Sequence, residues 1–310
     1  MQIHNVKKKK SNPLDRMNAF DWIIGFILTV FVLLMIYPIY QCLVISLNDG
    51  ADLQFNGVVY LWPRKFSIES YVTVFKDSSF LLAAFNTIAR TVLGSFLSIL
   101  ITSGFAFAIS HNNLVMRRFL TILGVITMYI GGGLIPTFLV VKDLGLYDTF
   151  WVYLILPAFT MFNCTVFVTY FKGIGNEIEE SAMIDGANDL TIFYRIILPI
   201  AKPVFACILL FVAVQQWNAY QDCMIYTKNE NLTVLSYRFA KMLLVQQQVE
   251  KAMLDYESMT QEQMMALAGP VSSTTLQVST MMITIIPIIC VYPFLQKYFV
   301  KGIMVGSLKG

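Results

Sequence analysis

Long apolar runs alternate with shorter polar segments along most of the chain. Each apolar run is long enough to cross a bilayer, which requires about 20 apolar residues in a helix. Lipid offers the backbone no hydrogen-bonding partner, so we expect the spanning segments to be helical. The pattern therefore predicts an all-α membrane protein with six transmembrane helices, at about residues 22–45, 81–110, 119–141, 150–171, 203–225 and 273–295.

Basic residues lie mainly on one side of this six-span arrangement. An even number of spans places both termini on the same side, and cytoplasmic segments are enriched in Lys and Arg. The leader at 1–19, the loops at 111–118 and 172–202, and the C-terminal end hold 13 of the 22 Lys and Arg residues. We therefore expect both termini to be cytoplasmic, flanking a transmembrane domain at 20–300 with a tail at 301–310.

Composition supports the membrane interpretation and excludes several other classes. Hydrophobic residues make up 57% of the chain, charged residues 13%, and the mean hydropathy is +0.65, which exceeds what a soluble core requires. The five cysteines lack zinc or redox spacing, and two histidines are too few for a metal site. No stretch reads G-x-x-x-x-G-K-[ST], and no nucleophile–base set is visible. We expect no catalytic residue, no metal ligand and no nucleic-acid partner.

One long polar interval separates two apolar runs on the predicted cytoplasmic side. Residues 176–203 have the pattern of two short helices joined by a turn. Gly186 can end the first helix in a left-handed conformation, and Asn188 or Asp189 can cap the second. Pro199 then interrupts the second helix and turns the chain back toward the membrane. Such a knob is suited to fit a socket on another protein.

This interval resembles a loop of the permease subunits of bacterial ABC importers. The similarity is carried by Glu180-Ser181-Ala182, by Gly186, and by Ile196-Ile197-Leu198-Pro199, and the triplet Asp185-Gly186-Ala187 looks like the version found in sugar importers. Two departures are Ser181, where alanine is usual, and Gly175, where sugar permeases usually have proline. The resemblance implies ATPase coupling by the loop at 176–199, through Glu179, Glu180, Ser181, Ala182, Asp185, Gly186, Ala187, Ile196, Leu198 and Pro199.

Further runs extend the resemblance over roughly residues 20–310. Gly132-Gly133-Leu-Ile-Pro136, Trp217-Asn218 and Tyr292-Pro293-Phe-Leu-Gln-Lys-Tyr-Phe look like the permeases of the maltose-importer superfamily. The first and the last of these runs resemble in particular the lipoprotein-type or polysaccharide permeases. The resemblance implies a type I ABC importer permease fold in the bacterial cytoplasmic membrane. It also implies import of a sugar or oligosaccharide through one half of a hetero-dimeric pathway.

The same resemblance implies several partners. They are a second, non-identical permease, two nucleotide-binding ATPase subunits, membrane lipid and an extracellular lipid-anchored substrate-binding protein that docks on the outer segments at 48–80 and 228–270. The chain itself is expected to hold no cofactor, because ATP and Mg would be bound by the ATPase subunits.

Polar side chains within the apolar runs are the candidates for a substrate path. Such groups are costly in lipid and usually face the helix bundle or a water-filled cavity. We assign Asn86, Arg90, Asn163, Gln216, Trp217, Asn218, Tyr220 and Asp222 to this set. An alternative is that these groups satisfy helix–helix hydrogen bonds, with Arg90 paired to Asp222, or that the partner permease makes most sugar contacts.

A second function class is an ion-gradient-driven secondary transporter. Such a protein would use intramembrane carboxylates or repeated broken helices. Asp222 is the one acidic candidate in the apolar runs, and no repeat is visible. This alternative leaves the polar loop at 176–199 without a role.

Overall fold

The computed structural model describes residues 19–111, 113–244 and 271–307. The leader expected at 1–19, apart from its last residue, lies outside the described residues, as do 245–270 of the outer segment and the end of the tail. The described part of the chain is helical and contains no β-strand. The all-α fold class predicted from the sequence is therefore confirmed.

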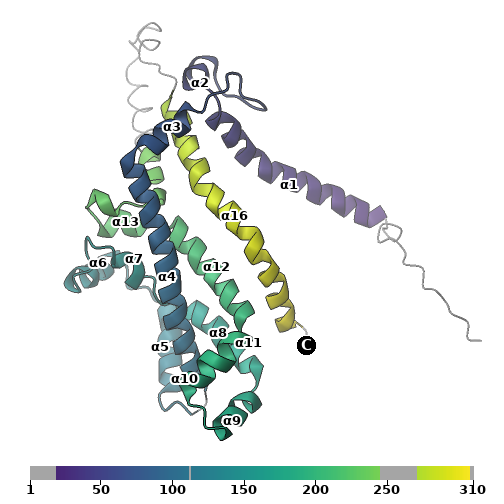
Figure 1. Ribbon diagram of the computed structural model, residues 1–310, viewed down its shortest axis with the longest axis vertical. Helices are drawn as coiled ribbons and strands as arrows, with labels where there is room; N and C mark the ends of the chain where they lie inside the picture. The colour runs from purple at the N-terminus through teal and green to yellow at the C-terminus, as the bar shows by residue number, and fades with distance from the viewer. Residues whose placement is uncertain (1–18, 112, 245–270, 308–310) are drawn as a thin grey trace, which may run out of the picture.

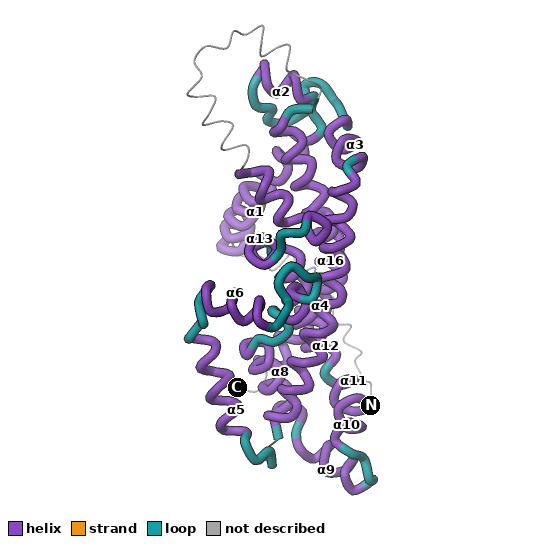
Figure 2. Tube along the Cα trace, turned by 90° about the vertical axis from the view of Figure 1, so that its left-hand side faces the viewer, coloured by secondary structure: helices purple, strands orange, loops and turns teal. Residues whose placement is uncertain are grey.

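The molecule is an elongated helical bundle built along one long helix, α4 (Figures 1 and 2). A further helical stretch at 235–244 follows a 3-10 turn at Glu230–Leu232. The named helices, in chain order, are α1 (Ala19–Ser46), α2 (Gly50–Asn56), α3 (Glu69–Lys76), α4 (Ser78–Ser110), α5 (Arg117–Tyr129), α6 (Leu134–Asp143), α7 (Val152–Ile155), α8 (Met161–Ile174), α9 (Asn176–Ile184), α10 (Asp189–Ile192), α11 (Leu198–Ile200), α12 (Lys202–Asn218), α13 (Gln221–Tyr226) and α16 (Ser273–Ser307).

Three described helices are long and apolar enough to cross a membrane unbroken. They are α1, α4 and the first part of α16, Ser273–Val291. A fourth candidate is the pair Asp189–Ile200 and Lys202–Asn218, which is bent by 84°. The helix of α16 continues to Ser307, beyond the span end expected near residue 295, because neither Pro287 nor Pro293 ends it.

The other expected spans are interrupted helices. The stretch at 119–141 divides into α5 and α6 next to Gly133, whose φ of +80° is in the region that favours glycine. The stretch at 150–171 divides into α7 and α8 around Pro157, which lacks the N–H that a continuous helix needs. The stretch at 203–225 likewise divides into α12 and α13. Hydropathy alone does not show these breaks.

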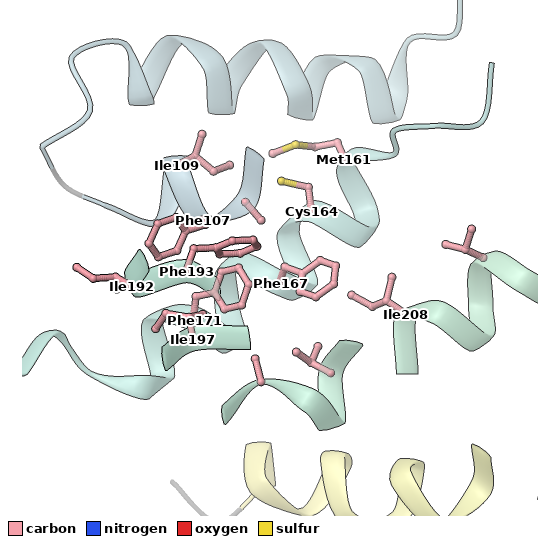
Figure 3. Packing of buried hydrophobic residues seen from close by; sticks show 14 of the residues in the cluster. Phe107, Ile109, Met161, Cys164, Phe167, Phe171, Ile192, Phe193, Ile197 and Ile208 are labelled. Atoms are coloured by element: carbon pink, nitrogen blue, oxygen red, sulfur yellow. The ribbon is translucent and has the colours of Figure 1, made fainter. Parts of the chain in front are cut away.

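A cluster rich in aromatic side chains packs α4, α8 and α12 together with α10 and the helical segment Phe193–Ile197 that follows it (Figure 3). Phe167 stacks on Phe171 with ring centroids 5.6 Å apart, and Phe107 lies 5.1 Å from Phe193. Ile197 is fully buried in the same cluster. This core holds the second half of the polar loop firmly against the end of α4.

Outside this aromatic core, carboxylates hold the loops by accepting hydrogen bonds from backbone groups. Asp77 accepts hydrogen bonds from Ser79 N at 2.9 Å and pairs with Arg238. Asp148, at φ +57°, accepts from the backbone N–H groups of Lys228 and Asn229, both at 2.8 Å. Asp148 therefore joins the turn after α6 to the segment after α13.

Helix α1 extends away from the bundle and contacts α16 at the end of the molecule where α2 and α3 lie (Figure 1). None of the residues in its most apolar window is buried within this chain. A surface of this kind must be covered by lipid or by another apolar helix, since exposed apolar area of this size is unfavourable in water.

Candidate functional site: the helix–turn–helix knob and the buried arginine network

The polar loop forms the two short helices that its sequence predicts. Helix α9 ends at Ile184, and Gly186, two residues later, has φ +83°. Gly186 N donates to Met183 O at 3.0 Å, and Ala187 N donates to Ala182 O at 3.0 Å. These are the two hydrogen bonds of a Schellman motif, which requires a left-handed residue at this position. The turn is therefore defined by local chemistry.

The second helix of the knob begins at Asp189, and Asn188 rather than Asp189 is the residue that caps it. The Asn188 side chain accepts a hydrogen bond from Thr191 N at 2.8 Å, which satisfies one exposed N–H of the first turn. The helix continues from α10 through the π-helical segment Phe193–Ile197 into α11. Gly175, before α9, has φ +91°, a conformation closed to the proline that is usual there in sugar permeases.

The predicted coupling residues divide between two faces of the knob. One group is exposed and one packs inward or is only partly accessible, so no single surface contains the whole set. The exposed members are Glu180, Ser181, Asp185, Gly186 and Pro199. The others are Glu179, Ala182, Ala187, Ile196 and Leu198, of which Ala182 is buried.

Large apolar side chains accompany the exposed acidic residues, and sequence reasoning missed them. Ile184 is 87% exposed and Leu190 is 68% exposed, with Met183 and Tyr194 half exposed nearby. Met183 and Ile184 belong to α9 and Leu190 to α10, the helices at the lower tip of the molecule as drawn in Figure 2. Apolar residues within a polar loop were the signal available in the sequence. An apolar tip with an acidic rim is typical of a protein-binding surface.

Glu179 contacts a residue that the sequence analysis set aside. Its Oε2 atom lies 2.8 Å from Nε2 of His111, at the end of α4. The two side chains are 12% and 24% exposed. Glu179 therefore attaches α9 to α4, whereas its neighbour Glu180 is exposed.

Arg90 is the centre of a buried polar network in α4. Its side chain is 1% exposed, and all five N–H groups donate. Nη1 donates to Ala219 O at 3.2 Å and Asp222 Oδ1 at 3.1 Å, and Nη2 donates to Gln216 Oε1 at 3.0 Å and to Asp222 Oδ2. Nε also donates to Gln216, and the guanidinium lies 4.5 Å above the Tyr153 ring. The pairing of Arg90 with Asp222, the alternative considered from the sequence, is confirmed.

Most of the other candidates for the substrate path are buried or form hydrogen bonds within the chain. Asn86 donates to Asn231 O at 2.6 Å and to Thr233 O at 3.0 Å. Trp217 Nε1 donates to Thr284 O at 3.1 Å. Asn163 is 6% exposed. In this conformation these side chains stabilise the bundle and leave few groups for a ligand.

A cavity of about 670 Å³ contains the candidates that remain accessible. Asn218 and Tyr220 line it together with Gln215, Gln221 and Asp222. Tyr220 is 39% exposed, so its ring offers an apolar face beside amide groups. Amides and an aromatic ring can hydrogen-bond and stack on a sugar. Among the described residues there is no group of three His, Cys, Asp or Glu side chains that could hold a metal ion.

Comparison with known proteins places this architecture in one class. The chain is 32% identical to the polygalacturonan/rhamnogalacturonan transport system permease protein YtcP of Bacillus subtilis (strain 168), over 94% of this chain and 98% of that protein. It is 34% identical to Protein LplC of the same organism, over 81% and 82% of the two chains. No protein-family model matches the chain.

A solved structure shares both sequence and fold. It is a chain from a bacterial ABC transporter involved in the import of the acidic polysaccharide alginate, with 32% identity, a TM-score of 0.80, and coverage of 93% of this chain and 99% of that one. A second chain, from the alginate transporter in complex with its pentasaccharide-bound periplasmic protein, is 14% identical with a TM-score of 0.53 and shares the fold alone. The chain belongs to the permease subunits of bacterial ABC importers for sugars and oligosaccharides.

Proposed function

We propose that this permease is one half of a hetero-dimeric pathway that imports an oligosaccharide through the bacterial cytoplasmic membrane. Its six apolar runs cross the membrane, three of them as broken helices, and both termini face the cytoplasm. The excess of Lys and Arg on one side supports this orientation. The knob around α9 is then cytoplasmic, and the loops around α2 and α3 are external.

The observation that carries the proposal is the exposed tip of the knob. Glu180, Asp185, Ile184 and Leu190 are all exposed on a knob whose turn is held by its own hydrogen bonds. A preformed turn binds without a large ordering cost. The tip docks in a cleft of an ATPase subunit, where Glu180 pairs with a basic residue. ATP and Mg are bound by two such subunits, and their closure moves the knob and switches the pathway by a rigid-body change.

Two further partners are proposed from the remaining surfaces. A second, non-identical permease together with lipid covers the apolar faces of α1, α5 and α6. A lipid-anchored binding protein docks on the external loops at 48–80 and around 228–270. The solved alginate transporter complexed with its periplasmic protein supports such an arrangement.

The proposed substrate is an oligosaccharide derived from a polysaccharide. Support comes from relatives named for polygalacturonan, rhamnogalacturonan and alginate. Within this chain, Asn218 and Tyr220 in the 670 Å³ cavity are the accessible groups for contact with a sugar. The alternative of an ion-driven transporter finds little support, because Asp222, its one carboxylate candidate, is paired with Arg90.

The test is purification of the tagged protein from native membranes, followed by mass spectrometry and an uptake assay. Wild type should carry a second permease and an ATPase. Glu180→Lys and Gly186→Leu should insert normally but lose uptake by more than tenfold. For Glu180→Lys the reason is that disrupting a docked charge pair costs about 2–5 kcal/mol. For Gly186→Leu the reason is that a leucine is strained at φ +83°, so the turn of the knob is distorted. Glu177→Lys, exposed on the same helix, is the control for added charge. Normal uptake in both coupling variants would refute the assignment of the knob.

A further inference from the structure

The two adjacent glutamates of α9 face different surroundings. Successive helical residues are rotated by about 100°, so neighbouring side chains cannot share one partner surface. Glu180 faces solvent, whereas the Glu179 carboxylate lies 2.8 Å from Nε2 of His111. Glu180 is thus available to another protein, and Glu179 is directed at this protein's own α4.

His111 is held rigidly at the C-terminal end of α4. Its Nδ1 lies 2.8 Å from the carbonyl oxygen of Phe107, one turn earlier in the chain. A carbonyl oxygen only accepts, so Nδ1 carries the hydrogen and donates it. The imidazole also packs edge-on against the Phe107 ring, with centroids 4.5 Å apart. The imidazole is therefore part of the end of α4 and moves with it.

The two helices of the knob are attached to this end of α4 in different ways. The second helix is attached by apolar packing: Ile192, Phe193 and Ile197 are buried, and Phe193 contacts Phe107 (Figure 3). In α9, Ala182 is the one buried side chain among those that the structure describes. The attachment of α9 therefore depends strongly on the contact between Glu179 and His111.

The contact between Glu179 and His111 is short, but it is not a well-aligned hydrogen bond. The atoms are 2.8 Å apart, yet Nε2 makes no hydrogen bond of good geometry. A hydrogen bond weakens steeply when it bends, so a contact that already lies off the ideal angle keeps α9 close to α4 without fixing the orientation of α9. Helix α9 can therefore rotate about this contact without losing it.

We propose that His111 is a positioning residue for energy coupling, which with Glu179 forms a pivot that transmits movement of α9 to α4. Helix α4 carries Arg90, whose network reaches the break between α12 and α13 beside the 670 Å³ cavity. Movement of the knob thus reaches the pathway through one continuous helix. This inference rests on the proposed docking of α9 on an ATPase subunit.

The test is a double-mutant cycle on the whole transporter in proteoliposomes, with sugar uptake per ATP hydrolysed as the readout. His111→Ala and Glu179→Ala should each lower this ratio about fivefold, which is about 1 kcal/mol. The double variant should be no worse than either single one, because both remove the same contact. His111→Lys should restore part of the ratio, because it places an ammonium group opposite the Glu179 carboxylate. Glu177→Ala is the matched control on α9.

Two further measurements separate this inference from the proposed function. Co-purification of the ATPase should be normal for His111→Ala, in contrast to Glu180→Lys. Amide hydrogen exchange of α9 should be faster in His111→Ala, while that of α12 is unchanged. Additive effects in the cycle, or unchanged exchange in α9, would overturn the pivot. If wild type carries no ATPase, the proposed function fails, and the exchange measurement still decides whether His111 holds α9.

Discussion

Loss of the Asp222 carboxylate should destabilise this permease far more than a surface change. In Asp222→Ala, the guanidinium of Arg90, 1% exposed, loses its counter-ion and two hydrogen-bond acceptors. Removal of one partner of a buried ion pair costs about 3–5 kcal/mol, because the remaining charge is uncompensated. For a chain of this size that corresponds to a thermal midpoint lower by roughly 10 °C. The midpoint can be measured by fluorescence-detected size exclusion after heating in detergent.

The control is replacement of both charges together. Arg90→Met combined with Asp222→Leu should recover most of the lost stability, since an apolar pair of similar volume is often no less stable than a buried ion pair. A different result would refute the structural role. If Asp222→Ala kept the wild-type midpoint but raised the KM for sugar uptake, Arg90 would be a substrate ligand rather than part of a structural ion pair.

Two other perturbations test local features. In Gly94→Ala, the new Cβ would clash with the side chain of Gln216, whose Cδ is 3.0 Å away, so we expect about 1–3 kcal/mol of destabilisation. Gly104→Ala, with no atom within 4 Å, should be neutral or stabilising in the same midpoint assay. Backbone hydrogen bonds lower the pKa of Asp148, so its ionised form stabilises the fold. The midpoint advantage of wild type over Asp148→Asn should be present at pH 6 and fall as the pH drops below about 3.9, and a pH-independent difference would contradict this.

Much of the secondary structure could be predicted from hydrophobic runs and short-range signals. The unbroken helices α1, α4 and α16 follow from length and hydropathy. The knob follows from Gly186 and Asn188, which act on backbone groups within a few residues. Such interactions depend on neighbours in the sequence, so they can be read without knowing the path of the chain.

The direction in which each functional side chain faces could not be predicted in the same way. Glu179 and Glu180 are equivalent by composition, and the packing of α9 against α4 distinguishes them. The contacts of His111 and Tyr153 could not be predicted from the sequence, because each side chain contacts a residue that is distant along the chain.

What the sequence determined by itself is the membrane class, the positions of the apolar runs, the two-helix knob and the resemblance to sugar permeases. What the tertiary structure decided is which polar groups are free. Arg90 and Asp222 are 132 residues apart, and the folded chain brings them together. In this conformation their side chains are used by this pairing, whereas Asn218 and Tyr220, two other candidates for substrate contact, line an accessible cavity. The physical reason is that a buried charge requires a partner, and only the path of the chain decides which group supplies it.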